Sequence, residues 1–308
     1  MADHALALSA MGRGNAAACY RELGAEMRRL REAAGLTGRS IARKTKWDPT
    51  RVSRIESGQI NIDVADLCWY LGILRVDRDV ALPLIDLCRQ AKEDKGFWLS
   101  QHGEWIPDTL SSLIYHESTA SLSIGYEPMV VPGLLQTERY AHAMISRERW
   151  RTPADIESAV EIRLDRRNTL DRLSSKYVFY IHEQALRLEV GSANLMYEQM
   201  IALTLAAAEP KLELRVVPAK AGARSYFGQD FVLFQYEEHE PLAYLGGAVT
   251  ALFLEDPTYI ATYSALANEL ASVAMVAEES RSFIAALADE YDRRGFRHAT
   301  DRVEEEQF

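Results

Sequence analysis

Apolar residues recur at helical spacing along the first part of the chain. In the first such segment, Leu23, Met27, Leu30 and Ala34 lie three or four residues apart, which places them on one face of a helix. Four more segments with the same kind of pattern follow, around Ile41, Val52, Leu67 and Leu84. The pattern predicts a compact five-helix domain over residues 19–92, preceded by a flexible arm at residues 1–18.

The third of these segments carries start and stop signals at both ends. Asp48 is a favourable N-cap, and Pro49 suits the first helical position, where no backbone N–H is needed. Val52 and Ile55 are three residues apart and can both pack inward, and Gly58 can end the helix. The outward positions include two arginines and a small polar residue, a composition that suits entry into the major groove of DNA.

Charge is distributed unevenly along the chain. The formal net charge is −10, yet residues 13–58 hold 11 lysine and arginine residues against 5 acidic ones. From residue 93 to the end the counts are 20 and 34. A basic segment in an acidic protein predicts a local nucleic-acid-binding module, and the acidic remainder must bind something other than DNA.

The same N-terminal segment resembles a known family. Residues 23–37, Ile41-Ala42 and the run 52–58 are similar to the repressor-type helix-turn-helix of the xenobiotic-response-element (XRE) family, over most of residues 21–75. The resemblance implies a buried ion pair between Arg31 and Glu56. Family members often carry a phosphate-anchoring glutamine where this chain has Gly38, so Arg39 or Arg43 would have to take that role.

The DNA contacts expected from this helix-turn-helix fall into two groups. The candidates for contacts with base edges are Pro49, Thr50, Arg51 and Arg54. The candidates for phosphate contacts, which position the protein without reading sequence, are Arg39, Arg43, Lys44, Gln59 and Asn61. The partner is therefore expected to be double-stranded DNA. One short helix reads few bases, so a homodimer on two half-sites is expected.

The acidic part of the chain mixes strand and helix patterns. Residues 177–181 and 212–217 alternate as strands do and flank a helical segment at 193–208, which predicts a parallel crossover. Residues 231–236 and 242–245 predict a hairpin, and two helices are expected at 257–276 and 279–293. The fold class is therefore α+β and multidomain, with a linker at 93–107 and a mixed α/β domain with a small sheet at 108–293. A charged tail is expected at 294–308, disordered from Arg297 onward.

A second resemblance covers residues 108–285. The run 131–137 followed by Tyr140-Ala141, the arginines at 163–167 and the segment 182–187 are similar to the C-terminal domain of actinobacterial regulators of the WhiJ type. The resemblance implies a regulatory domain that binds a small companion protein. The chain departs from that pattern at residues 244–247, where a Tyr-Leu-Gly-Gly run replaces one that contains an acid.

A small-molecule ligand is the alternative for this domain, which would make the protein a one-component sensor. The residues expected to line a ligand or partner pocket are Tyr126, Pro132, Gly133, Gln136, Tyr140, Arg163, Arg166 and Arg167. The arginines could receive an acidic ligand, or they could form a solvated helix face with Glu161 and Asp165 as partners.

Other classes of function find little support in the sequence. The seven histidines are scattered, and no metal-ligand spacing, nucleophile elbow or phosphate-binding glycine loop is present, so no enzyme, metal or cofactor is expected. The odd count of three cysteines argues against a disulfide framework. No signal peptide and no membrane-spanning run is seen, and a cytoplasmic protein is expected.

Overall fold

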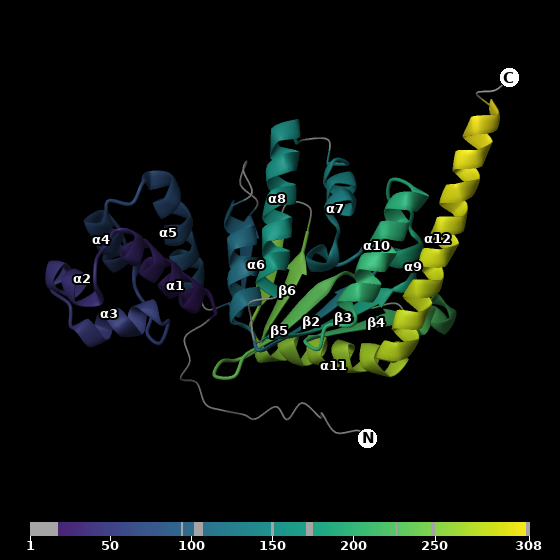
Figure 1. The fold of residues 1–308 in the computed structure, drawn as a ribbon. Coiled ribbons are helices and arrows are strands. Elements are labelled where there is room, and N and C mark those ends of the chain that lie inside the picture. The colour runs from purple at the N-terminus through teal and green to yellow at the C-terminus, as the bar shows by residue number, and fades with distance from the viewer. Residues whose placement is uncertain are drawn as a thin grey trace. The chain divides into compact units, whose positions relative to one another are not determined.

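The computed structural model describes residues 18–93, 95–101, 107–148, 151–170, 175–225, 227–247 and 250–305. The chain divides into two compact units between Lys95 and Gly96 (Figure 1). The predicted arm at residues 1–18 lies outside the described residues apart from Ala18, with which the first helix begins.

The described residues of the N-terminal unit form the five helices that the sequence predicts. Their bounds are α1 Ala18–Ala33, α2 Gly38–Thr45, α3 Pro49–Glu56, α4 Val64–Leu74 and α5 Arg78–Lys92. The apolar residues at helical spacing are buried against one another, among them Leu23, Met27, Ile41, Val52, Ile55 and Leu67. The helical spacing of the apolar residues therefore predicts correctly which helix faces pack together in this unit.

Two glycines allow α1 to approach the end of α3 closely. A Cβ atom on Gly24 would lie 2.3 Å from the backbone oxygen of Ile55, so only glycine permits this contact. Gly58 has a φ of +68° and ends the α3 turn, and a Cβ atom there would lie 2.5 Å from the Cα of Arg21. The position of α3 on α1 therefore depends on both glycines.

The C-terminal unit is built on one seven-stranded sheet with the order β1-β7-β6-β5-β2-β3-β4. The strands β2, β3 and β4 are parallel, and the other neighbours are antiparallel. Their bounds are β1 Phe97–Gln101, β2 Leu122–Glu127, β3 Lys176–His182, β4 Leu212–Val217, β5 Phe231–Gln235, β6 Leu242–Gly246 and β7 Thr250–Leu254. The α+β two-domain class, the parallel strands at 177–181 and 212–217 and the 231–245 hairpin are confirmed.

The predicted linker at 93–107 is wrong at residues 97–101 and 107, and its residues 94 and 102–106 lie outside the described residues. Residues 97–101 form the edge strand β1, which pairs with β7, and α6 begins at Pro107. The physical reason is that this segment has aromatic surface to bury, since Trp98 is 3% exposed and stacks on Phe253 at 4.8 Å between ring centroids. The sheet is accordingly larger than the small one expected.

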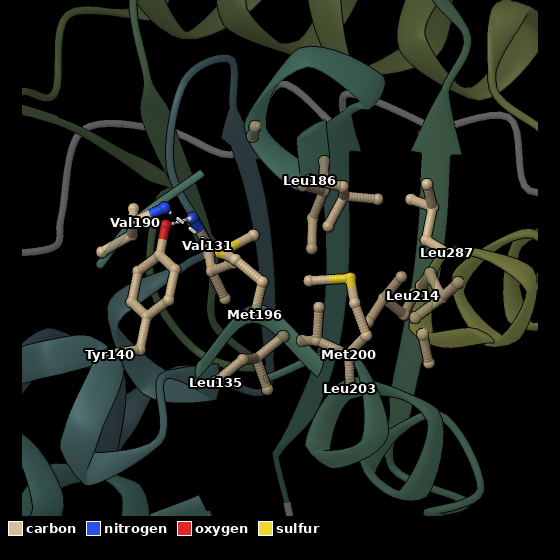
Figure 2. Close-up of a cluster of buried hydrophobic side chains, with 14 of the residues drawn as sticks. Val131, Leu135, Tyr140, Leu186, Val190, Met196, Met200, Leu203, Leu214 and Leu287 are labelled. Carbon is tan, nitrogen blue, oxygen red and sulfur yellow. Dashed lines mark hydrogen bonds between the residues drawn. The ribbon is translucent and has the colours of Figure 1, made fainter. Parts of the chain in front are cut away.

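Helices cover both faces of the sheet (Figure 1). One face packs against α11, through Ile260 and Leu270 of that helix. The other face packs against α7, α10 and α12, and Figure 2 shows this core, with Tyr140, Met200 and Leu287 among its members. The bounds are α6 Pro107–Thr119, α7 Glu138–Ile145, α8 Pro153–Leu170, α9 Glu183–Arg187, α10 Ala193–Ala206, α11 Pro257–Val273 and α12 Ala277–Glu305, with short 3-10 turns at Gly133–Leu135 (η1) and Ala219–Ser225 (η2).

The tail that the sequence predicts to be disordered from Arg297 is helical over its described residues. The helix α12 continues to Glu305. Residues 294–305 contain no proline and one glycine, so nothing in the backbone chemistry forces the helix to end at 293.

The length and hydropathy of the helices bear on whether the chain could cross a membrane. Within the described ranges, no single helix is long and apolar enough to cross a membrane. The pair formed by α11 and the first part of α12 passes by length and composition only when combined, and its helices meet at 70°. Both helices bury apolar residues against the sheet, such as Leu270 and Ile284.

Candidate functional site

The helix α3 begins and ends at the signals seen in the sequence. The Asp48 side chain accepts a hydrogen bond from the backbone N–H of Thr50 at 2.7 Å, and Pro49 is the first helical residue. This bond also lowers the pKa of Asp48. At the other end the backbone N–H of Gly58 donates to the Ile55 carbonyl at 2.9 Å. These caps fix an eight-residue helix that would be marginal in isolation.

Three polar residues share the exposed face of α3. Thr50, Ser53 and Arg54 are exposed and lie three or four positions apart, while Val52 and Ile55 are buried on the opposite face. Sequence reasoning missed Ser53, although its spacing from Thr50 could have found it. Pro49 is also exposed. These four residues form one exposed surface of α3.

Arg51 differs from the other candidates for base contacts. Its guanidinium forms an ion pair with Asp66 of α4 and lies over the Trp47 ring at 4.5 Å from the centroid. The Arg51 side chain is 40% exposed. The structure therefore places Arg51 beside α4 and off the face that carries Thr50 and Arg54.

The candidates for phosphate contacts surround α3. Arg39, Arg43 and Lys44 are exposed on α2, and Gln59 and Asn61 are exposed in the segment after α3. Arg39 and Arg43 line a hollow between α2 and α3 together with residues that include Lys46 and Pro49. Lys46 was not anticipated from the sequence. Its φ of 60° at the end of α2 holds it beside the two arginines.

The ion pair implied for Arg31 and Glu56 is present and nearly buried. The Arg31 Nε and Nη2 atoms donate to the two Glu56 carboxylate oxygens, each at 2.7 Å. Arg31 Nη1 donates to the Leu36 carbonyl, and the Tyr70 hydroxyl donates to Glu56 Oε1, both at 2.7 Å. Burial and the bond to Glu56 raise the pKa of Tyr70. Each buried charge thus has several compensating partners, and the pair ties α1 to the end of α3.

The C-terminal unit contains a cavity of about 320 Å³ on the sheet face opposite α11. Five of the predicted pocket residues line it, namely Pro132, Gly133, Gln136, Arg163 and Arg166. Tyr126 lies among Phe227 and Phe231 on the other face of the sheet. Tyr140 is buried in the core shown in Figure 2, where its hydroxyl oxygen accepts a hydrogen bond from the Val131 N–H at 3.3 Å. Arg167 does not line the cavity.

The arginines of α8 have partners other than their helix neighbours. Arg163 Nη1 donates to Gln136 Oε1 at 2.9 Å. Arg166 donates to both carboxylate oxygens of Glu117 on α6, at 2.7 and 3.2 Å. The solvated face with Glu161 and Asp165 as partners is therefore wrong for Arg163 and Arg166. Burial also lowers the pKa of Arg163.

Two carboxylates that sequence reasoning missed also line the cavity. Burial and, to a smaller extent, the neighbouring Asp230 raise the pKa of Glu127 to about 8, and Arg163 opposes this shift. Burial raises the pKa of Asp230 as well. No local sequence signal marks either residue, because the β2–β5 pairing brings them together from distant parts of the chain.

Two family models match the chain. Residues 22–82 match a helix-turn-helix domain, and residues 110–286 match a domain of unknown function, DUF5753. A comparison with curated proteins finds no match. A solved structure titled "Structure of TrmBL2, an archaeal chromatin protein, shows a novel mode of DNA binding" matches at 14% identity over 74% of this chain and 71% of that chain. Its TM-score of 0.31 is too low to support an argument.

The helix-turn-helix match agrees with the capped helix α3 and its exposed face, and both point to a DNA-binding regulator. The second match spans more than half of the chain. The protein therefore belongs to the DUF5753 family, with a helix-turn-helix domain preceding the family domain.

Proposed function

We propose that this protein is a non-enzymatic transcriptional regulator that inserts α3 into the major groove of double-stranded DNA. The observation that carries the proposal is the exposed α3 face with Thr50, Ser53 and Arg54. The buried Arg31–Glu56 pair holds that face in place from behind. A rigid, capped helix with an outward arginine suits hydrogen bonding to guanine. DNA binding places the protein with the DNA, which we propose is in the cytoplasm.

The DNA contacts divide into base and phosphate contacts. Arg54 and Thr50 are proposed to contact base edges, together with Pro49 and Ser53. Arg51 can join them only by leaving Asp66 and Trp47. Phosphates are proposed to contact Arg39, Arg43, Lys44, Gln59 and Asn61, which are all exposed. The resemblance to XRE regulators supports this division.

A homodimer is the form proposed to bind DNA. The eight residues of α3 reach only a few base pairs, so a second copy is needed for a specific site. Two copies would read half-sites about 34 Å apart, one turn of the duplex. Light scattering on the free protein and footprinting on its DNA site test this.

The DUF5753 domain is proposed to control DNA binding in response to a signal. The resemblance to actinobacterial WhiJ-type regulators favours a small companion protein as that signal. The cavity of about 320 Å³ favours the alternative, a small-molecule ligand, because pockets for such ligands begin at roughly this size. Mass spectrometry of what co-purifies from the native host separates the two, since one gives a stoichiometric protein and the other a metabolite.

DNA affinity as a function of salt tests the proposed interface. The affinity of the full chain should fall with salt, and Arg39→Ala or Arg43→Ala should reduce the slope by about one each on every sequence. Arg89→Ala is the matched control, because Arg89 is also exposed, on α5, and pairs with Asp86. Equal slopes for all three variants would contradict the proposal.

A further inference from the structure

The cavity in the C-terminal unit has an ordered floor. The β2 residues Ser123, Gly125 and Glu127 line it at every second position, as expected for one face of a strand. Beside Ser123 lie Tyr177 of β3 and Phe234 of β5. Beside Gly125 lie Phe179 and Val232 from the same two strands. The floor is therefore aromatic and apolar along its length, and Gly125 keeps its middle open.

One end of this floor is acidic. Asp230 immediately precedes Phe231, which pairs with Tyr126, so the antiparallel β2–β5 register continues to place Asp230 opposite Glu127. Two like charges directly opposite each other are unfavourable unless something compensates them. In the part of the chain that the structure describes, no hydrogen bond to the Glu127 carboxylate is present. Asp230 accepts a backbone hydrogen bond from Gly246.

The other charged groups of the cavity are already paired. Arg166 is bound to Glu117 through two hydrogen bonds, and Arg151 forms an ion pair with Glu148. The charges that remain around the acidic end are Glu127, Asp230 and Arg163. With both carboxylates ionised their sum is −1, so one bound positive charge would neutralise the cavity.

The opposite end of the floor holds an unused polar group. Ser123 is 5% exposed, and its hydroxyl oxygen has no hydrogen-bond partner within the described residues. A buried hydroxyl without a partner is unfavourable, so its presence in a cavity wall indicates a group that binds there. Ser123 lies four residues from Glu127 along β2, or about 13 Å.

Two other kinds of occupant fit less well. A metal ion needs more ligands, and no group of three or more histidine, cysteine or acidic side chains that could hold one exists within the described ranges. An anion would meet Arg163 but also two carboxylates. The arrangement favours a positive charge attached to an apolar body.

We propose that this cavity binds a small organic cation, an amine whose ammonium group lies between Glu127 and Asp230 and whose apolar body lies along β2 toward Ser123. The inference rests on the proposed regulatory role of the C-terminal unit and names the chemical class of its signal. A polar group at the far end of the ligand would bind the Ser123 hydroxyl. Binding would couple to protonation, because Glu127 carries a proton near pH 7 in the empty protein and the cation favours its ionised form.

The test uses arylalkylamines of increasing chain length, each with its matched alcohol and carboxylate, titrated into the full chain without DNA. The amines should bind at least about tenfold more tightly than the alcohols, and the carboxylates least. Calorimetry in buffers of different ionisation enthalpy should show proton release at pH 7. The other charged or titratable groups that line the cavity with Glu127 are Asp230, Arg163, Arg166, Glu117, Glu148, Tyr177 and Tyr244.

Matched variants assign the binding to this cavity. Glu127→Gln combined with Asp230→Asn should abolish the preference for amines over alcohols. Ser123→Ala should weaken only amines with a terminal hydroxyl group. The control is Glu157→Gln, at a carboxylate that is 73% exposed on α8. It should change neither the preference for amines nor the affinity for hydroxylated amines.

The proposal is overturned if no amine of the series binds, if carboxylates bind as tightly as amines, or if the double variant keeps the preference. Because DNA is absent, any of these results would leave the proposed role of α3 untouched. Loss of DNA binding alone would likewise leave amine binding intact.

Discussion

Two sites, one in each unit of this protein, hold charged side chains away from water, and they differ in how those charges are compensated. In the N-terminal unit, Arg31 and Glu56 bind each other through two hydrogen bonds, and Leu36 and Tyr70 satisfy the atoms that remain. In the C-terminal unit, Glu127 faces Asp230 without comparable partners. A buried charge that is fully compensated holds a fold together, whereas an uncompensated one beside a cavity indicates a function.

The largest effect is expected from breaking the compensated pair. Arg31→Ala leaves Glu56 buried without its main partner, which should destabilise the N-terminal unit by about 3–5 kcal/mol. Denaturant unfolding of the full chain measures the loss. Arg28→Ala is the control, because Arg28 pairs with Glu32 in the same helix but is 64% exposed, and it should cost under ~1 kcal/mol. Similar losses of stability for both variants would show that the buried pair is no more important for stability than the exposed one.

Removing the uncompensated charge of Glu127 should stabilise the protein at high pH, whereas removing Arg31 should destabilise it. Because the pKa of Glu127 is raised to about 8, the folded protein retains a proton that the unfolded chain gives up near its ordinary, lower pKa. This retained proton stabilises the folded protein. Its contribution is fully present at pH 4 and is lost as the pH rises through about 8, the pKa of Glu127 in the folded state. Glu127→Gln should therefore be close to wild type at pH 4 and more stable at pH 9.

Thermal unfolding at the two pH values measures this difference. The gain at pH 9 should be on the order of a few kcal/mol, at 1.36 kcal/mol per unit of pKa shift. The pKa of Asp230 is raised as well, so the stability of the variant should still depend on pH to some extent. Glu157→Gln should change little at either pH. If Glu127→Gln destabilises the protein at pH 9, Glu127 has compensating partners after all, and the contrast between Glu127 and the Arg31–Glu56 pair fails.

The smallest effect concerns the exposed charges that the N-terminal unit presents outward. A Cβ atom on Gly38 would meet nothing within 4 Å, so a glutamine fits at the start of α2. Gly38→Gln should add one phosphate contact and strengthen DNA binding by ~1 kcal/mol, roughly fivefold. Gly38→Ala, which cannot reach a phosphate, should leave the affinity unchanged. Equal DNA affinity for both variants would show that a side chain at position 38 does not contact a phosphate.

The N-terminal unit could be predicted from the sequence because its determinants are local. Asp48, Pro49 and Gly58 each act on a backbone position within a few residues, and the helical pattern needs no knowledge of the rest of the chain. The Arg31–Glu56 pair was implied by resemblance rather than by chemistry. What the sequence missed there, the engagement of Arg51 by Asp66, depends on how α4 packs beside α3.

The cavity could not be predicted because its determinants are not local. Glu127 and Asp230 are more than a hundred positions apart, and only the β2–β5 register makes them neighbours. Tyr126 and Glu127 are adjacent in sequence, yet strand alternation sends them to opposite faces of the sheet. The prediction of Tyr126 in the pocket is wrong for this reason, and Glu127 lines the cavity instead.

The most direct test of the account is the selection of binding sites from randomised DNA by the wild type and by Arg54→Ala in parallel. If the exposed face of α3 reads base edges, the wild type selects a motif, and the variant loses its preference at one base-pair position in each half-site, with a discrimination of about 1–3 kcal/mol. If the wild type selects no motif, or if Arg54→Ala weakens binding equally on every sequence, then α3 does not read DNA as proposed.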